Sequence, residues 1–139
     1  MGRARASDGI RRTIAQYCQL CDDGRFDEWI ALFTADARFH VMGRTTMGRA
    51  DIKAFMEVGQ REELRGRHAT FEPLIDLAED GNTARVWTDF VFVDKGGTIT
   101  TIGRYHDEMA RGTDGRWRYV LHEIVFLGGT PELAQPTPA

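Results

Sequence analysis

The stretch TARVWTDFVFVDKGGTITTIGRYHDEMARGTDGRWRYVLHEIVF, residues 83–126, decides the fold of this chain. Its apolar and polar residues alternate with a period of two, as in strands that bury one face. The segments DKGGT (94–98) and GTDGR (112–116) carry the Gly-Gly and Asp-Gly signals of antiparallel hairpins. With the run before EDGNT (79–83), the pattern predicts four strands, at about 67–79, 83–94, 98–111 and 116–127. Strands of this length twist and curl, so we expect a curved sheet.

The residues before these four predicted strands, which form an antiparallel meander, follow a helical period instead. Ser7 or Asp8 is suited to begin a first helix and Gly24 to end it. The apolar stripe of that helix recurs at i, i+4, i+7, i+8 and i+11 and consists of Ile10, Ile14, Tyr17, Cys18 and Cys21. A short second helix is predicted near Trp29, then a strand over 35–43 and a third helix over 50–63.

This order of elements, helices first and a strand meander last, indicates an α+β fold. We expect three N-terminal helices packed in the concave face of a curved, mainly antiparallel sheet, which together form a cone-shaped barrel. A single domain is expected over residues 1–139, with an ordered core at about 8–127 and a mobile tail at 128–139. A cone stays open at its wide end, where a small apolar molecule could bind.

Composition and charge exclude several classes of protein. The chain is 42% hydrophobic and 28% charged and has a formal net charge of −3, which is typical of a globular domain and argues against a nucleic-acid partner. No apolar run approaches the roughly 18 residues that span a bilayer, and no secretory leader is recognisable. We therefore expect a cytoplasmic protein that does not contact membranes.

The two cysteines, Cys18 and Cys21, form a C-x-x-C pair inside the first helical pattern. A redox pair would sit at a helix N-terminus, and structural zinc needs four ligands, so buried thiols are expected instead. The four histidines show no metal-ligand spacing, and no nucleotide-binding motif is present. The sequence predicts no metal and no cofactor.

Four segments in this order resemble the nuclear-transport-factor-2-like superfamily, and within it the SnoaL-like branch. They are IAQYCQLCDDGRFDEWIALFTADARFHV (14–41), GRADI (48–52), RHATF (67–71) and GRYHDEMARGTDGRWRYVLHEIVF (103–126). The branch is similar to scytalone dehydratase, bile-acid dehydratase and ketosteroid isomerase. The resemblance covers about residues 8–127 and implies a homodimer. It also implies a catalytic set, which falls here on Tyr17, Asp22, His68 and Asp89.

The activity that this resemblance implies is that of a cofactor-independent lyase (dehydratase) or isomerase. His68, oriented by Asp22, would take a proton from a small apolar carbonyl compound such as a steroid or polyketide. Tyr17 would donate a hydrogen bond to the developing oxyanion, and Asp89 would assist. Aromatic residues are expected to bind the substrate, although such a stripe is also typical of a core: Phe33, Phe39, Phe55, Trp87 and Tyr105.

Alternatives remain at each of these positions. His68 can be a histidine at a strand start, Asp22 a solvated helix end and Tyr17 a core residue. Tyr17 and Asp22 are five residues apart, so they point about 140° from each other on an ideal helix. Asp89 lies inside or outside the cone depending on whether a bulge precedes it. A non-catalytic ligand-binding or dimerising module of the same fold is the alternative function.

Overall fold

A computed structural model describes residues 2–127, in which three helices pack against one curved sheet. The helices are α1 (Gly2–Asp22), α2 (Phe26–Trp29) and α3 (Arg49–Gly59), with the short 3-10 turns η1 (Ile30–Leu32) and η2 (Glu62–Leu64). The strands are β1 (Phe33–Val41), β2 (Arg44–Met47), β3 (Arg67–Thr70), β4 (Leu74–Leu77), β5 (Thr83–Val93), β6 (Ile99–Arg111) and β7 (Trp117–Phe126). The α+β class is confirmed. The predicted tail at 128–139 lies outside the described residues.

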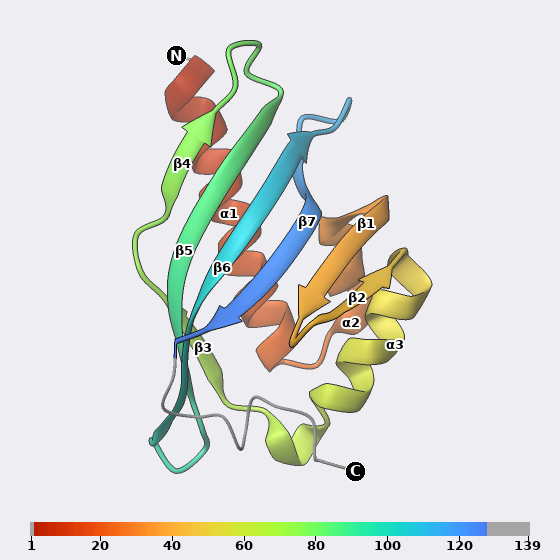
Figure 1. Ribbon diagram of the computed structural model, residues 1–139, viewed down its shortest axis with the longest axis vertical. Coiled ribbons are helices and arrows are strands. Elements are labelled where there is room, and N and C mark those ends of the chain that lie inside the picture. Colours follow the sequence, from red (N-terminus) through yellow and green to blue (C-terminus); the bar gives the residue numbers. More distant parts are fainter. Residues whose placement is uncertain (1, 128–139) are drawn as a thin grey trace.

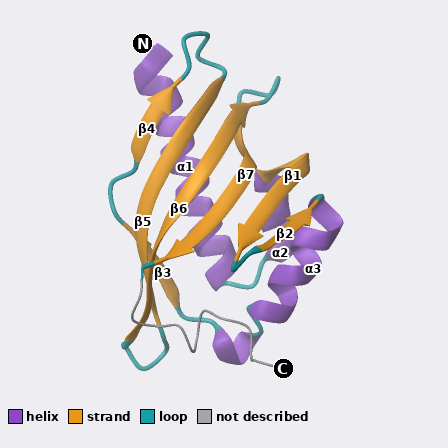
Figure 2. Ribbon diagram, in the orientation of Figure 1, coloured by secondary structure: helices purple, strands orange, loops and turns teal. Residues whose placement is uncertain are grey.

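The sheet is curved but does not close. Its strand order is β2-β1-β7-β6-β5-β3, with β4 also paired to β5, so β2 and β3 remain at opposite ends. β1 runs parallel to β7, and the other pairs are antiparallel. The helices lie on one side of this sheet, with α1 along the inner face of the meander and α3 beside β1 and β2 (Figures 1 and 2).

Two boundaries differ from those predicted, for local reasons. The first long strand is split into β3 and β4, because Pro73 between them has no backbone N–H to donate to β5. Helix α1 begins at Gly2, so Ser7 and Asp8 lie inside it. The extra turn is held by tertiary packing, since Ala6 is buried and Gly9 lies against the indole of Trp117.

The core lies between α1 and the concave face of the sheet. Its largest fully buried side chains are mostly aromatic and come from α1, α2 and strands β1, β6 and β7: Tyr17, Trp29, Phe33, Phe39, Tyr105 and Tyr119. No helix within residues 2–127 is both long and apolar enough to cross a bilayer. Three of these aromatic side chains, Tyr17, Phe39 and Tyr105, also line the cavity described next.

Candidate functional site

A cavity of about 480 Å³ opens between α3 and the sheet, where strands β1, β5 and β7 end. This volume is in the range of small-molecule sites. Most of its wall is apolar and comes from Phe39, Val41, Phe55, Met56, Phe90, Phe92, Ile124 and Phe126. The polar groups are few and include Tyr17, Gln60, His68, Thr101 and Tyr105. The arrangement suits an apolar molecule that is oriented by a small number of hydrogen bonds.

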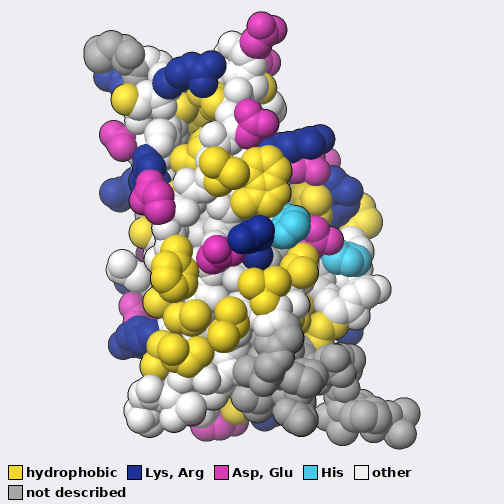
Figure 3. Space-filling model, turned by 60° about the vertical axis from the view of Figure 1, so that its left-hand side comes forward, with side chains coloured by type: hydrophobic (Ala, Val, Ile, Leu, Met, Phe, Trp, Pro, Cys, Tyr) yellow, Lys and Arg dark blue, Asp and Glu magenta, His cyan; other side chains and the backbone are white. Residues whose placement is uncertain are grey.

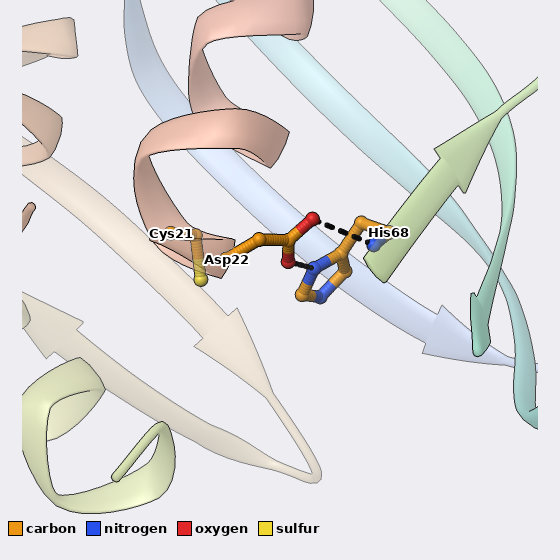
Figure 4. Close-up of side chains that lie close together, drawn as sticks. All are labelled: Cys21, Asp22 and His68. Atoms are coloured by element: carbon orange, nitrogen blue, oxygen red, sulfur yellow. Dashed lines mark hydrogen bonds and ion pairs between the residues drawn. The ribbon is translucent and has the colours of Figure 1, made fainter. Parts of the chain in front are cut away.

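His68 and Asp22 form a hydrogen-bonded pair at the edge of this cavity (Figure 4). The Nδ1 atom of His68 lies 2.6 Å from Oδ1 of Asp22, and the backbone N–H of His68 donates to Oδ2 at 2.9 Å. Both carboxylate oxygens therefore hold the same residue, one through its ring and one through its backbone. The two side chains are only 10% and 4% exposed, so water weakens this interaction little.

The pair forms because two chain segments end in the right places. Helix α1 ends in a Schellman motif, in which Arg25 N–H donates to the Leu20 carbonyl and Gly24 takes a φ of +71°. Asp22 is thereby held at the last turn, facing β3. At the start of β3 the backbone passes very close to β5, since a Cβ on Gly66 would lie 2.1 Å from the carbonyl oxygen of Val93. Only glycine permits that approach.

This geometry explains how Tyr17 and Asp22 can belong to one site although they point in different directions from α1. Tyr17 and His68 line the cavity, whereas Asp22 does not and reaches it only through the His68 ring. With Asp22 ionised, Nδ1 is the donor and Nε2 is the basic nitrogen of His68. Within residues 2–127 no side chain or backbone group hydrogen-bonds to that Nε2 atom. The ring can therefore act as a base toward a ligand.

The tyrosines of the cavity wall stay in their neutral form. Tyr17 and Tyr105 are about 2% exposed, and burial raises the pKa of both phenols well above the usual value. A neutral phenol can donate a hydrogen bond to an oxyanion in the cavity. Tyr17 is thus a core residue that packs on Trp29 and also presents its edge to the ligand space.

Three of the five predicted aromatic residues line the cavity: Phe39, Phe55 and Tyr105. Phe33 does not, because it is fully buried between Trp29 and Tyr119 and supports the wall from behind.

Trp87 and Asp89 lie on the convex face of the sheet, outside the cavity. Asp89 pairs there with Arg104, whose Nε is 2.6 Å from its Oδ1 atom. The register between β5 and β6 is regular from Thr83 to Phe92, so no bulge turns Asp89 inward. Neither Asp89 nor Trp87 can contact a ligand in this cavity, which corrects the roles assigned to them from the sequence.

A second aspartate–histidine pair, Asp107 with His122, was not recognised as a site from the sequence. Nδ1 of His122 lies 2.5 Å from Oδ1 of Asp107, and both side chains are almost completely buried. Strict alternation places Asp107 on the same face as Tyr105 and Met109, and this signal could have marked it as inward-facing.

Cys21 lies beside the His68–Asp22 pair, and these three residues are a candidate metal group within residues 2–127, with ligand atoms within 4.8 Å of one another. Both Asp22 oxygens already accept hydrogen bonds from His68. Burial, with the nearby charge of Asp22, raises the pKa of the Cys18 thiol to about 12 and that of Cys21 further. The prediction of buried thiols is confirmed, and protonated thiols are poor metal ligands.

The family model for the SnoaL-like domain matches residues 2–121. No curated protein matches the sequence significantly. Several solved structures share the fold. A putative scytalone dehydratase from Novosphingobium aromaticivorans is 23% identical with a TM-score of 0.74, and the alignment covers 87% of this chain and 83% of that one. ActVI-ORFA from Streptomyces coelicolor is 22% identical with a TM-score of 0.69, and the alignment covers 86% of this chain and 95% of that one.

A third similar structure is the β subunit of a putative aromatic-ring-hydroxylating dioxygenase from Novosphingobium aromaticivorans. It is 20% identical with a TM-score of 0.70, and the alignment covers 95% of this chain and 97% of that one. At these identities the solved structures establish the fold alone. The family model spans most of the sequence. The chain therefore belongs to the SnoaL-like family of the nuclear-transport-factor-2-like superfamily.

Proposed function

We propose that the protein is a cofactor-independent lyase (dehydratase) or isomerase that removes a proton next to the carbonyl group of a small apolar compound. The observation that carries this proposal is the His68–Asp22 pair, whose imidazole lies on the wall of an apolar cavity. A carboxylate that orients a histidine and stabilises its protonated form is a recurring way to make a base at neutral pH.

The proposed reaction begins when Nε2 of His68 takes a proton from the carbon next to the carbonyl. The C–H electron pair moves into the enolate, and Asp22 stabilises the imidazolium through Nδ1–H. The Tyr17 hydroxyl donates a hydrogen bond to the enolate oxygen. The imidazolium then returns its proton. Return to a departing β-hydroxyl releases water, and return to another carbon completes an isomerisation.

The size and wall chemistry of the cavity favour a neutral, largely apolar substrate, such as a steroid or polyketide. Within the described part of the chain no arginine or lysine lines it, and the acidic residues there are Glu63 and Asp94. The similar structure named as a putative scytalone dehydratase supports the dehydratase form of the proposal.

The direct test is solvent isotope exchange. Neutral hydroxy-ketones and enones of suitable size are incubated with the protein in D2O, and deuterium at the carbon next to the carbonyl is measured by mass spectrometry. Protein-dependent incorporation into at least one compound supports proton abstraction. Compounds that bind in the cavity and gain no deuterium would contradict it.

A non-catalytic module is the second candidate, and it has an observation in its favour. The β subunit of a putative aromatic-ring-hydroxylating dioxygenase has the same fold over nearly its full length. As its name states, that protein is one subunit of a larger enzyme. In such a module the cavity would hold a ligand without turnover, or the sheet would bind another chain. The isotope experiment separates these two candidates.

We also propose that the chain forms a homodimer through the convex face of its sheet. Hydrophobic side chains gather on this face (Figure 3). They include two cross-strand pairs, Leu74 with Trp87 and Val91 with Ile102, which lie on either side of the Asp89–Arg104 ion pair. Leu74 and Ile102 are 67% and 45% exposed. A patch of this kind usually marks an interaction surface.

The homodimer predicts that Ile102→Glu, which places a charge in the patch, yields a monomer. Light scattering at micromolar concentration should give about twice the chain mass for the wild type and one chain mass for the variant. Val58→Glu is the control, because Val58 is also apolar and is more exposed than Ile102 but lies on α3, away from this face. A monomeric wild type would count against the proposal.

A further inference from the structure

Asp107 and His122 form a second acid–base pair that the proposed reaction does not use. Their side chains are 1% and 0% exposed, and they lie opposite each other on β6 and β7. Within residues 2–127, Nε2 of His122 and Oδ2 of Asp107 have no hydrogen-bond partner. A buried polar pair with unpaired atoms is costly, and burying apolar groups there would serve stability as well. Its presence therefore calls for another explanation.

The pair lies directly behind the floor of the cavity. The His122 ring is 4.6 Å from the ring of Tyr17 and 4.6 Å from that of Tyr105, measured between centroids. Both tyrosines line the cavity, whereas Asp107 and His122 do not. Two further aromatic rings, those of Tyr119 and Phe39, have centroids 5.0 and 5.2 Å from that of His122. One aromatic layer therefore separates the pair from the ligand.

The charge state of the pair follows from its burial. A net charge in this dry aromatic environment is strongly disfavoured. Burial raises the pKa of Asp107, and the attraction of His122 opposes the rise. The forms with no net charge are an imidazolium with a carboxylate, and a neutral imidazole with a carboxylic acid. In both forms one proton lies between Nδ1 and Oδ1, and Nε2 carries another.

The Nε2–H group is thus the positive end of the pair, and aromatic rings surround it. The Tyr17 and Tyr105 rings lie 4.6 Å from the imidazole, tilted by 49° and 47°, so both phenols are close to this positive end. A nearby positive charge favours the anionic form of a phenol and makes its O–H a stronger hydrogen-bond donor. The titratable groups around His122 are Tyr17 from α1, Tyr105 and Asp107 from β6, and Tyr119 from β7. In an interior of low dielectric this local field is little screened.

We propose that the Asp107–His122 pair is a positioning unit of the cavity, which gives the Tyr17–Tyr105 floor a preference for an oxyanion over a neutral ligand. The inference deepens the proposed function and rests on it, since the enolate is the oxyanion that would form there. It also narrows the substrate class to carbonyl compounds whose oxygen reaches this floor, with the reacting carbon toward His68. His122 acts through the tyrosines and does not touch the substrate.

The experiment compares 4-nitrophenol with nitrobenzene, which differ by one hydroxyl group. Absorbance distinguishes bound 4-nitrophenol from bound 4-nitrophenolate, so the pH at which the bound probe ionises can be read directly. The variant Asp107→Leu/His122→Phe replaces the pair by apolar groups of similar size, which buried ion pairs generally tolerate. We expect the bound probe to ionise about one pH unit higher in the variant, a tenfold loss of preference for the anion. Nitrobenzene should bind both proteins equally.

Two further variants make the test specific. Thr88→Val changes another buried polar atom without a partner on the same face, next to Tyr105 in the register, and should leave probe ionisation unchanged. Asp107→Val/His122→Leu also removes both polar groups but with smaller apolar side chains, and serves if the first variant does not fold.

Unchanged ionisation in the pair variants, or an equal change in Thr88→Val, would overturn the inference and leave the His68–Asp22 proposal standing. Failure of both probes to bind would also overturn it, because the floor would then hold no aromatic oxyanion. Isotope exchange in the wild type still decides the proposed function separately.

Discussion

His68→Ala should lower the rate of proton abstraction from a bound carbonyl compound by about 10²–10⁴-fold, the usual contribution of a positioned general base. The variant removes the nitrogen that takes the proton, and among residues 2–127 no other histidine lines the cavity. Its acidic residues, Glu63 and Asp94, are in part committed elsewhere, since Oδ1 of Asp94 accepts the backbone N–H groups of Gly96 and Thr98.

Asp22→Ala should show a loss of similar order for a different reason. Without the carboxylate, Nδ1 of His68 has no acceptor, so the ring loses both its orientation and the charge that stabilises its protonated form. Asp22→Asn separates these two effects, because the amide oxygen can still accept from Nδ1–H while the negative charge is gone. We expect its rate to lie between those of the wild type and Asp22→Ala.

These rates can be measured by deuterium incorporation into whichever carbonyl compound the wild type labels. His106→Ala is the matched control, because His106 lies on the convex face, is about half-exposed and does not line the cavity. Circular dichroism and ligand affinity verify that the variants remain folded. Full exchange activity in His68→Ala, with an intact fold, would refute the assignment of the base.

The fold could be predicted from the sequence because it depends on local signals. The period of two and the turn residues between 83 and 126 specify the meander, and the curvature follows from strand length. The boundaries that differed depended on single residues, such as Pro73, or on tertiary packing, such as that of Ala6 at the start of α1. Contacts of this kind cannot be predicted from local patterns in the sequence.

The site was harder to predict from the sequence than the fold, for a physical reason. Asp22 and His68 are 46 residues apart, so only the family resemblance could bring them together before the structure was known. Alternation assigned Trp87 and Asp89 to one face, but did not say which face was concave. The Asp107–His122 contact depends on a register that shifts between Glu108 and Met109, and no periodicity predicts such a shift.

The largest effect on stability is expected from His122→Ala, which should lower the free energy of unfolding by about 3–5 kcal/mol. The substitution leaves Asp107 buried without a partner for its charge or its proton. It also opens space among Tyr17, Tyr105 and Tyr119, whose ring centroids all lie within 5.0 Å of that of the imidazole. Asp107→Leu/His122→Phe should be nearly as stable as the wild type, since neither of these two positions then holds an unpaired polar group.

Urea unfolding at neutral pH, followed by far-ultraviolet circular dichroism, measures both changes, provided that the slope of free energy against urea stays constant. His106→Ala, a histidine on the same sheet but exposed, should change the free energy by less than about 0.5 kcal/mol. If the double variant lost as much stability as His122→Ala, the pair itself would be stabilising the core. Its position behind Tyr17 and Tyr105 would then be a consequence of packing. A stable double variant would instead mean that the fold has no need of this pair, which leaves the chemistry of the cavity as the reason for keeping it.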